Sequence, residues 1–150
     1  MILIDAPFSE FRGFLAVFLS WLLSQLAKVA QGIIKKKRFN FRWLFDAGGM
    51  PSSHSATVAS LATVTGLYFG FGSVLFLVVL IFSVITMFDA AGVRRSVGRQ
   101  AQTLNKMLDD FYEKGAVPEN RVKELLGHTP VEVFAGAFVG IVIAWIICKI

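Results

Sequence analysis

The feature that most constrains this chain is a long stretch without charge. From Ser55 to Phe88, 34 consecutive residues contain no Asp, Glu, Lys or Arg, whereas one membrane-spanning helix needs only about 20 apolar residues. The cluster Gly70-Phe71-Gly72-Ser73 divides this stretch at a turn-prone point. The stretch therefore predicts two spans, over residues 52–70 and 73–92, joined by a tight turn.

Two further apolar runs flank this pair. The first extends from Gly13 to Ile34 and lacks the basic start and small-residue cleavage site of a signal peptide. The last covers Val133 to Cys148 and can begin at Pro130. Hydrophobic residues form 55% of the chain and charged residues 17%, a balance that argues against an ordinary soluble domain. We expect an all-α integral membrane protein of one domain, residues 1–150, with spans at about 13–34, 52–70, 73–92 and 130–148.

An extended polar region lies between the third and fourth spans. Its apolar residues recur every three or four positions, which is typical of an amphipathic helix: Val97, Ala101, Leu104, Leu108 and Phe111. Gly115 predicts the end of that helix. Pro118 predicts the start of a second short helix, which Gly127 ends.

The net charge of +5 is concentrated in two segments. Residues 35–42 and 94–123 hold 12 of the 15 Lys and Arg, and the turn at 70–73 holds none. Both segments flank apolar stretches, so the pattern indicates membrane orientation rather than nucleic-acid binding. By the positive-inside tendency both segments face the cytoplasm, and four spans then place both termini outside. The single cysteine, Cys148, cannot form an internal disulfide.

The string Gly48-Gly49-Met50-Pro51-Ser52-Ser53-His54-Ser55 stands at the start of the second span. A Pro-Ser pair before a long apolar run indicates a helix start with a hydroxyl cap. Helix N-termini bind anions, because their N–H groups point outward and the macrodipole favours negative charge. His54 would then lie beside any phosphate held there. An ordinary cap beside an interfacial histidine accounts for this string as well, and both interpretations stay open on these residues alone.

A second polar string, Gly127-His128-Thr129-Pro130-Val131-Glu132, begins the fourth span. A turn between helices accounts for most of it, with Gly127 ending one helix and Thr129-Pro130 starting the next. It does not account for Glu132, because a carboxylate at the head of a membrane helix is costly unless it is paired. Four residues after His128, Glu132 can reach back to the ring. A histidine held by a carboxylate presents its other nitrogen as a base or nucleophile.

Together these strings resemble the type 2 phosphatidic acid phosphatase superfamily, which includes vanadium-dependent haloperoxidases. That superfamily has Pro-Ser-Gly-His and, far downstream, a His followed four residues later by Asp; this chain has Pro-Ser-Ser-His and then Gly-His-Thr-Pro with Glu132. The closer resemblance is to a divergent branch of small bacterial and plant membrane proteins. It is carried by residues 48–55, 88–95 and 124–133, and it covers most of the chain from Lys28 onward.

The resemblance implies roles for individual positions. His128 would be the nucleophile that attacks phosphorus, Glu132 would orient it, and His54 would protonate the leaving oxygen. Ser52, Ser53 and their backbone N–H groups would hold the phosphate oxygens. No metal and no other cofactor is implied, so Lys, Arg and helix dipoles would have to meet the charge of the transferring phosphoryl group.

A lone lysine, Lys28, lies within the first span, where a charge is costly and marks a functional site by default. We expect it to bind phosphate, although snorkelling from near the helix end toward the basic segment is the structural alternative. Lys35 and Arg42 have the spacing of the superfamily's first motif, Lys, six residues, then Arg-Pro. Trp43, however, stands where that motif has its proline.

The arginine of the superfamily's third motif is absent, because Val122 occupies its position. Arg94 and Arg95 are predicted to replace it as phosphate ligands from a different segment, with Asp89 as their orienting partner. Asn105, on the following amphipathic helix, is a further supporting candidate.

The separation of the two histidines supports a shared site. His54 and His128 are separated by two predicted spans, which return the chain to the same face of the membrane. Both histidines would then lie at helix N-termini on the cytoplasmic side, as a common phosphate site requires.

These features predict metal-independent hydrolysis of a phosphomonoester or diphosphate on a membrane lipid, through a phosphohistidine, at the cytoplasmic face of a bacterial plasma membrane. Phosphatidylglycerol phosphate, phosphatidate and prenyl diphosphates all fit, and a cytoplasmic site favours the first. Two alternatives stay open: a catalytically silent membrane protein that keeps the anion pocket for binding or regulation, and a haloperoxidase that uses vanadate. The sequence also leaves homo-oligomerisation open.

Overall fold

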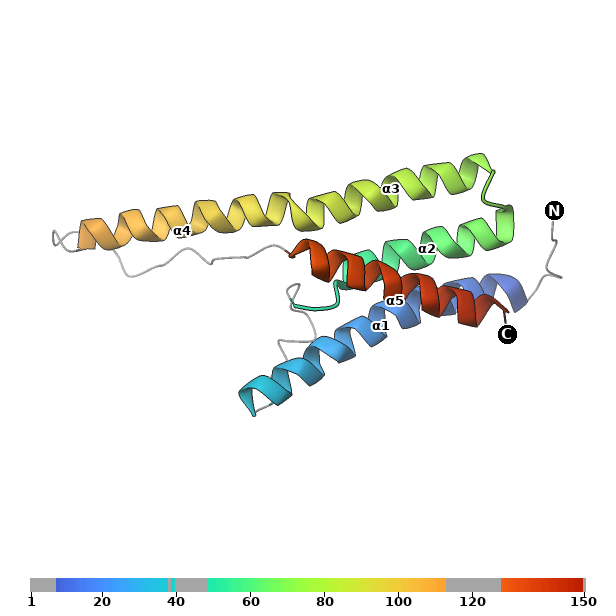
Figure 1. The fold of residues 1–150 in the computed structure, drawn as a ribbon, viewed down its shortest axis with the longest axis horizontal. Helices are drawn as coiled ribbons and strands as arrows, with labels where there is room; N and C mark the ends of the chain where they lie inside the picture. The colour runs from blue at the N-terminus through green and yellow to red at the C-terminus, as the bar shows by residue number, and fades with distance from the viewer. Residues whose placement is uncertain (1–7, 38, 40–48, 113–127, 150) are drawn as a thin grey trace.

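In the residues that it describes, a computed structural model of the chain forms α-helices (Figure 1). It describes residues 8–37, 39, 49–112 and 128–149. In these ranges all regular secondary structure is helical, which confirms the predicted all-α fold. The helices are α1 (Phe8–Lys36), α2 (Ser53–Phe69), α3 (Val74–Ala91), α4 (Val93–Tyr112) and α5 (Pro130–Lys149).

The apolar helices fall at the four predicted places. Within the described residues, α1, α3 and α5 are long and apolar enough to cross a membrane. α2 has 17 residues, or about 25 Å of helix, which is the short end of the range that spans hydrocarbon. It packs against α1, α3 and α5, so protein covers much of its surface. The chain is thus an integral membrane protein, and a full crossing by α2 stays a prediction.

The α2–α5 contact is made through small residues. A Cβ atom added to Gly136 would lie 2.2 Å from the carbonyl oxygen of Ser52, and one added to Gly140 would lie 2.1 Å from that of Ala56. The two backbones therefore touch at these glycines. Lipid tails are as apolar as side chains, so packing of this kind, rather than a hydrophobic driving force, holds membrane helices together.

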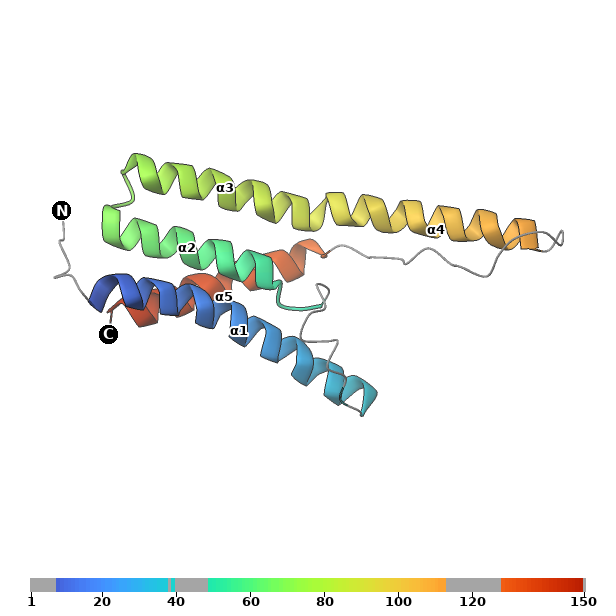
Figure 2. The same cartoon turned by 180° about the vertical axis from the view of Figure 1, so that it is seen from behind.

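The bundle has two distinct ends. Figures 1 and 2 place the end of α1, the starts of α2 and α5 and the end of α3 toward one end, and the start of α1, the end of α5 and the α2–α3 turn at the other. Gly70, with φ of 89°, ends α2 in the left-handed region, and Ser73 caps α3 by accepting from the Phe76 N–H at 3.1 Å. The predicted tight turn at 70–73 is confirmed.

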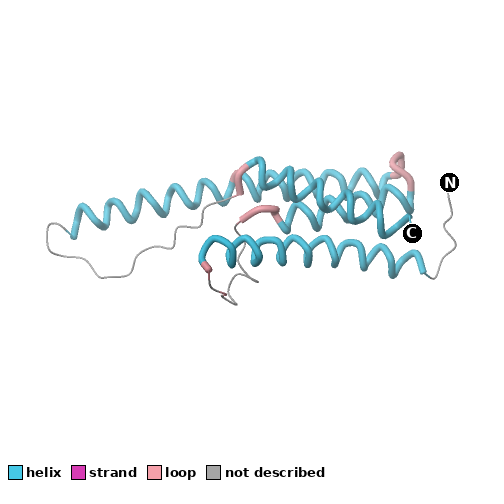
Figure 3. The backbone as a smooth tube through the Cα atoms, turned by 60° about the horizontal axis from the view of Figure 1, so that its bottom comes forward, coloured by secondary structure: helices cyan, strands magenta, loops and turns pink. Residues whose placement is uncertain are grey.

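α4 is the predicted amphipathic helix, but it continues α3 instead of standing apart in a loop. The Gly92 N–H donates to Phe88 O at 2.7 Å, and the Ser96 N–H donates to Gly92 O at 3.0 Å, so helical hydrogen bonds continue across the junction. α3 and α4 consequently form a nearly straight rod, and α4 extends past the bundle (Figure 3). Among the described helices it packs only against α3. The predicted cap at Gly115 and the short helix from Pro118 to Gly127 lie outside the described residues.

Candidate active site

The start of α2 is fixed by its own cap and by α5. Ser52 is the N-cap, and its fully buried hydroxyl accepts from the Ser55 N–H at 3.4 Å. The Ser52 N–H donates to the carbonyl oxygen of Glu132 at 3.0 Å. The first N–H groups of a helix have no partner within the helix and attract anions. This hydrogen bond therefore places an anion-binding helix start directly beside the first turn of α5.

α1 holds the same segment from the other side. Lys28 is 7% exposed, and its Nζ donates to Ser53 Oγ at 3.0 Å. One turn further along α1, Gln31 Nε2 donates to the carbonyl oxygen of Met50 at 2.8 Å. The lysine predicted as a phosphate ligand therefore points into the bundle and contacts the first turn of α2. Its side chain therefore does not snorkel toward the basic segment, which was the structural alternative.

His128 lies immediately before α5 and is held through both its backbone and its ring. Its backbone N–H donates to the carbonyl oxygen of Ala90 at 3.1 Å, near the end of α3. Its side chain is 1% exposed, and Nδ1 lies 3.0 Å from Oε2 of Glu132. The carboxylate thus reaches back to the ring, as the four-residue spacing predicts.

The tautomer of His128 follows from the other contact of Glu132. The same Oε2 accepts from the backbone N–H of Thr129 at 3.1 Å. An ionised carboxylate only accepts hydrogen bonds, so Nδ1 of neutral His128 must be the donor, and its lone pair lies on Nε2. Nε2 is buried and has no hydrogen-bond partner among the described residues. The result is an oriented imidazole with a nucleophilic nitrogen that the fold leaves unused.

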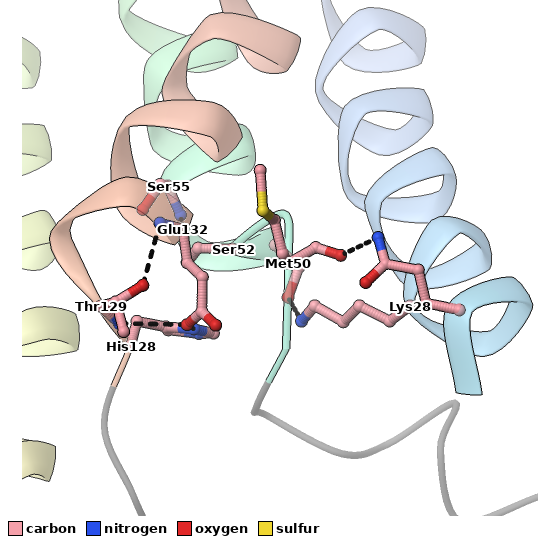
Figure 4. A network of polar contacts seen from close by, with 9 residues as sticks. Lys28, Met50, Ser52, Ser55, His128, Thr129 and Glu132 are labelled. Atoms are coloured by element: carbon pink, nitrogen blue, oxygen red, sulfur yellow. Dashed lines mark hydrogen bonds and ion pairs between the residues drawn. The ribbon is translucent and has the colours of Figure 1, made fainter. Parts of the chain in front are cut away.

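Figure 4 shows these groups in one view, with contributions from three helices. The His128 ring and the Glu132 carboxylate come from the start of α5, Ser52 lies at the start of α2, and Lys28 reaches toward that start from α1. A nucleophilic nitrogen, a helix N-terminus and a buried cation are the parts that phosphoryl transfer needs, because its catalysis consists mainly of positioning and charge stabilisation.

A family model described as the divergent PAP2 family matches residues 10–143. The chain belongs to the divergent PAP2 family. The uncharacterized membrane protein YuiD of Bacillus subtilis (strain 168) is 42% identical to it, over 84% of this chain and 87% of that protein. No solved structure matches the chain.

The other positions predicted for this divergent PAP2 protein lie on several helices. His54 lies in the first turn of α2 with an exposed side chain, and Lys35 is exposed in the last turn of α1. Asp89 is exposed, and its predicted pairing with Arg94 and Arg95 lies outside what the structure describes. The side chains of Arg94 and Arg95 and the whole of Arg42 lie outside what the structure describes.

Asn105 is buried, but it lies on α4. It is 15 residues beyond Ala90, where His128 is attached, and this separation corresponds to roughly 20 Å along a straight helix. The described helices therefore do not bring Asn105 to the His128 cluster.

Two residues of the site, Gln31 and Thr129, were given no role in it by the sequence analysis. Gln31 forms a polar stripe with Gln25 and Lys28 at a spacing of three, and this stripe was the only signal that the α1 face contacts a polar segment. Thr129 stands three residues before Glu132, the Ser/Thr-x-x-Glu spacing of a capping box. The polar stripe does not name its partner, because Met50 lies in another part of the chain, whereas the capping-box spacing joins Thr129 to Glu132 within one turn.

Proposed function

We propose that this divergent PAP2 protein is a metal-independent lipid phosphatase that hydrolyses a phosphomonoester or diphosphate through a phosphohistidine. The observation that carries the proposal is the state of His128. Its Nδ1 is held by Glu132 at 3.0 Å, while its Nε2 is buried without a partner among the described residues. A structural histidine in a core normally has both nitrogens satisfied.

The reaction is written in two steps. Nε2 of His128 attacks phosphorus, a bond to the lipid oxygen breaks, and His54 gives that oxygen a proton. Water then gives a proton to His54 and attacks the phosphohistidine, so the bond between phosphorus and Nε2 breaks, inorganic phosphate is released and both histidines are restored. Glu132 stabilises the positive ring that forms in the first step, as the carboxylate of a Ser-His-Asp triad does.

The charge of the transferring group would be met by groups beside His128. Lys28, the start of α2 and the hydroxyls of Ser52 and Ser53 are candidates for this role among the described residues. We assign Arg94 and Arg95 to the same role, since they follow within five residues of Ala90, which binds the His128 backbone. Lys35, Arg42 and Asp89 remain supporting candidates, whereas the position of Asn105 along α4 gives it no part in this step.

The substrate class follows from the setting of the site. His128 and Ser52 lie at the ends of apolar helices, the level at which a lipid headgroup meets water. Basic residues near such a surface attract anionic headgroups while the chains stay in the bilayer. Phosphatidylglycerol phosphate, phosphatidate and prenyl diphosphates fit this description, and a cytoplasmic site favours phosphatidylglycerol phosphate.

Phosphate release from these three lipids by the purified protein in detergent tests the proposal. We expect full activity in excess chelator, because none of the assigned roles needs a metal, and strong inhibition by vanadate, which mimics the five-coordinate transition state. Activity that is lost on chelation and restored by magnesium would contradict the mechanism. Saturable vanadate binding without phosphate release from any of the three lipids would favour the second candidate, a silent anion-binding protein. The burial of Nε2 is the observation that favours this candidate.

The orientation of the site gives a separate prediction. Lys35 lies in the last turn of α1 and Gly72 in the α2–α3 turn, and both are exposed. The end of α1 and the start of α5 lie toward one end of the bundle, and the α2–α3 turn lies at the other (Figure 2). In a protein with Cys148→Ser, a cysteine at position 72 should react with a membrane-impermeant thiol reagent added to intact spheroplasts. A cysteine at position 35 should react only after lysis, because the basic segment that begins there is expected in the cytoplasm.

The reverse labelling pattern would place the His128 end outside the cell. That result would redirect the substrate from a biosynthetic lipid phosphate toward a carrier lipid that is recycled on the outer face.

A further inference from the structure

The first turn of α5 contains a reciprocal pair of hydrogen bonds. Thr129 precedes the first helical residue, Pro130, and its Oγ1 accepts from the Glu132 N–H at 3.4 Å. In return, Oε2 of Glu132 accepts from the Thr129 N–H at 3.1 Å. This is a capping box, in which the cap residue and the third helical residue each satisfy a backbone N–H of the other.

The capping box and the histidine share one oxygen atom. Oε2 of Glu132 accepts the Thr129 N–H and also lies 3.0 Å from Nδ1 of His128, and the Glu132 side chain is 23% exposed. A glutamate side chain has three rotatable bonds, and ordering it costs conformational entropy. The backbone N–H of Thr129 offsets part of that cost, because it holds the carboxylate at the helix start beside the ring. The hydroxyl of Thr129 holds the backbone N–H of Glu132 in the same turn.

This geometry also explains the type of acid at position 132. A capping box uses Glu or Gln at the third helical position, because the side chain must reach back over a full turn to the cap N–H. The broader superfamily resembled by this chain has Asp four residues after the nucleophilic histidine. Here the longer side chain serves both the backbone of Thr129 and the ring of His128.

We propose that Thr129 is a positioning residue, whose capping box with Glu132 fixes the carboxylate on Nδ1 of His128 and thereby keeps the lone pair on Nε2. Its effect on turnover rests on the proposed phosphatase function, whereas its effect on the tautomer does not. Thr129 acts only through Glu132.

The test compares three variants of the full-length protein. Thr129→Gly keeps the backbone N–H that binds Oε2 but removes the hydroxyl that holds the Glu132 N–H, so it loosens the turn that carries the carboxylate. The helix itself loses little stability, because glycine is tolerated at N-caps almost as well as threonine. Thr129→Ser keeps the hydroxyl. Ser73→Gly is the matched control, because it removes the cap hydroxyl of α3 at the opposite end of the bundle.

The first readout is the ¹⁵N NMR spectrum of protein labelled at its histidines. The chain has only two histidines, so a His54→Asn spectrum assigns the signals of His128. We expect the Nδ1–H tautomer in the native protein, an increased share of Nε2–H in Thr129→Gly, and the native pattern in Thr129→Ser and Ser73→Gly. The second readout is turnover, for which Thr129→Gly should lower kcat roughly tenfold or more with KM unchanged, since small misplacements of a reacting group have effects of this size.

A native tautomer pattern in Thr129→Gly, or an equal change in Ser73→Gly, would overturn the proposal. Should Thr129→Gly fail to fold, Thr129→Ala removes the same hydroxyl and is measured in the same way. Absence of turnover in the native protein would count against the phosphatase function alone, and the tautomer spectra would still decide the role of Thr129.

Discussion

Replacing His128 by asparagine is expected to abolish lipid phosphate hydrolysis, lowering kcat by about 10⁴-fold or more. Asparagine keeps the backbone N–H that binds Ala90 O, but it has no nitrogen that can accept a phosphoryl group. The measurement is phosphate release in detergent, together with the thermal unfolding midpoint of each protein. Val131→Ala is the control, because it changes an exposed side chain in the same first turn of α5.

Glu132→Gln separates the charge of the acid from its position. Glutamine can complete the capping box, so the fold should be retained. Its amide can, however, donate to Nδ1 and place the ring proton on Nε2, and the wrong tautomer in a histidine–carboxylate pair has cost about 10⁴-fold in kcat elsewhere. Near-native turnover in either His128→Asn or Glu132→Gln would contradict the role that the proposed function gives to the His128–Glu132 pair.

The contact between α2 and α5 should be intolerant of any side chain at its glycines. A Cβ atom at Gly140 would lie 2.1 Å from the backbone oxygen of Ala56, and a backbone atom cannot turn aside as the end of a side chain can. Overpacking of this kind typically costs about 1–3 kcal/mol. We expect Gly140→Ala to lower the unfolding midpoint in detergent by roughly 5–10 °C, and Gly140→Leu to prevent assembly of the bundle.

Gly72→Ala is the matched control for this prediction. No atom lies within 4 Å of a Cβ at Gly72, and its φ is not in the left-handed region. Its unfolding midpoint should stay at the native value. An unchanged midpoint in Gly140→Ala would show that α2 and α5 are not in backbone contact at this point.

The helices themselves could be predicted because their signals are local. The charge-free stretch and the turn at 70–73 correspond to α2 and α3 within a few residues, and α5 begins at the predicted Pro130. A run of apolar residues predicts a membrane helix wherever it lies in the chain, since every backbone polar group must be satisfied within the helix. The continuation of α3 into α4 was not predicted, because a glycine such as Gly92 signals a break but does not impose one.

Some contacts of the candidate site could be predicted from the sequence and others could not. The His128–Glu132 pair follows from a spacing of four on one helix, so it needs no knowledge of the fold. The hydrogen bonds from Lys28 to Ser53 and from Gln31 to Met50 join α1 to the start of α2. No local spacing specifies them.

The sequence by itself therefore determined an all-α membrane protein, the places of its apolar helices, and the two polar strings at the starts of α2 and α5. Only the tertiary structure decided which groups of α1 and α3 meet those strings. The physical reason is that interhelical distance depends on packing between residues far apart in the chain. Gly136 lets α5 approach Ser52 so closely that the Ser52 N–H reaches the carbonyl oxygen of Glu132, and this contact brings the anion-binding end of α2 to His128.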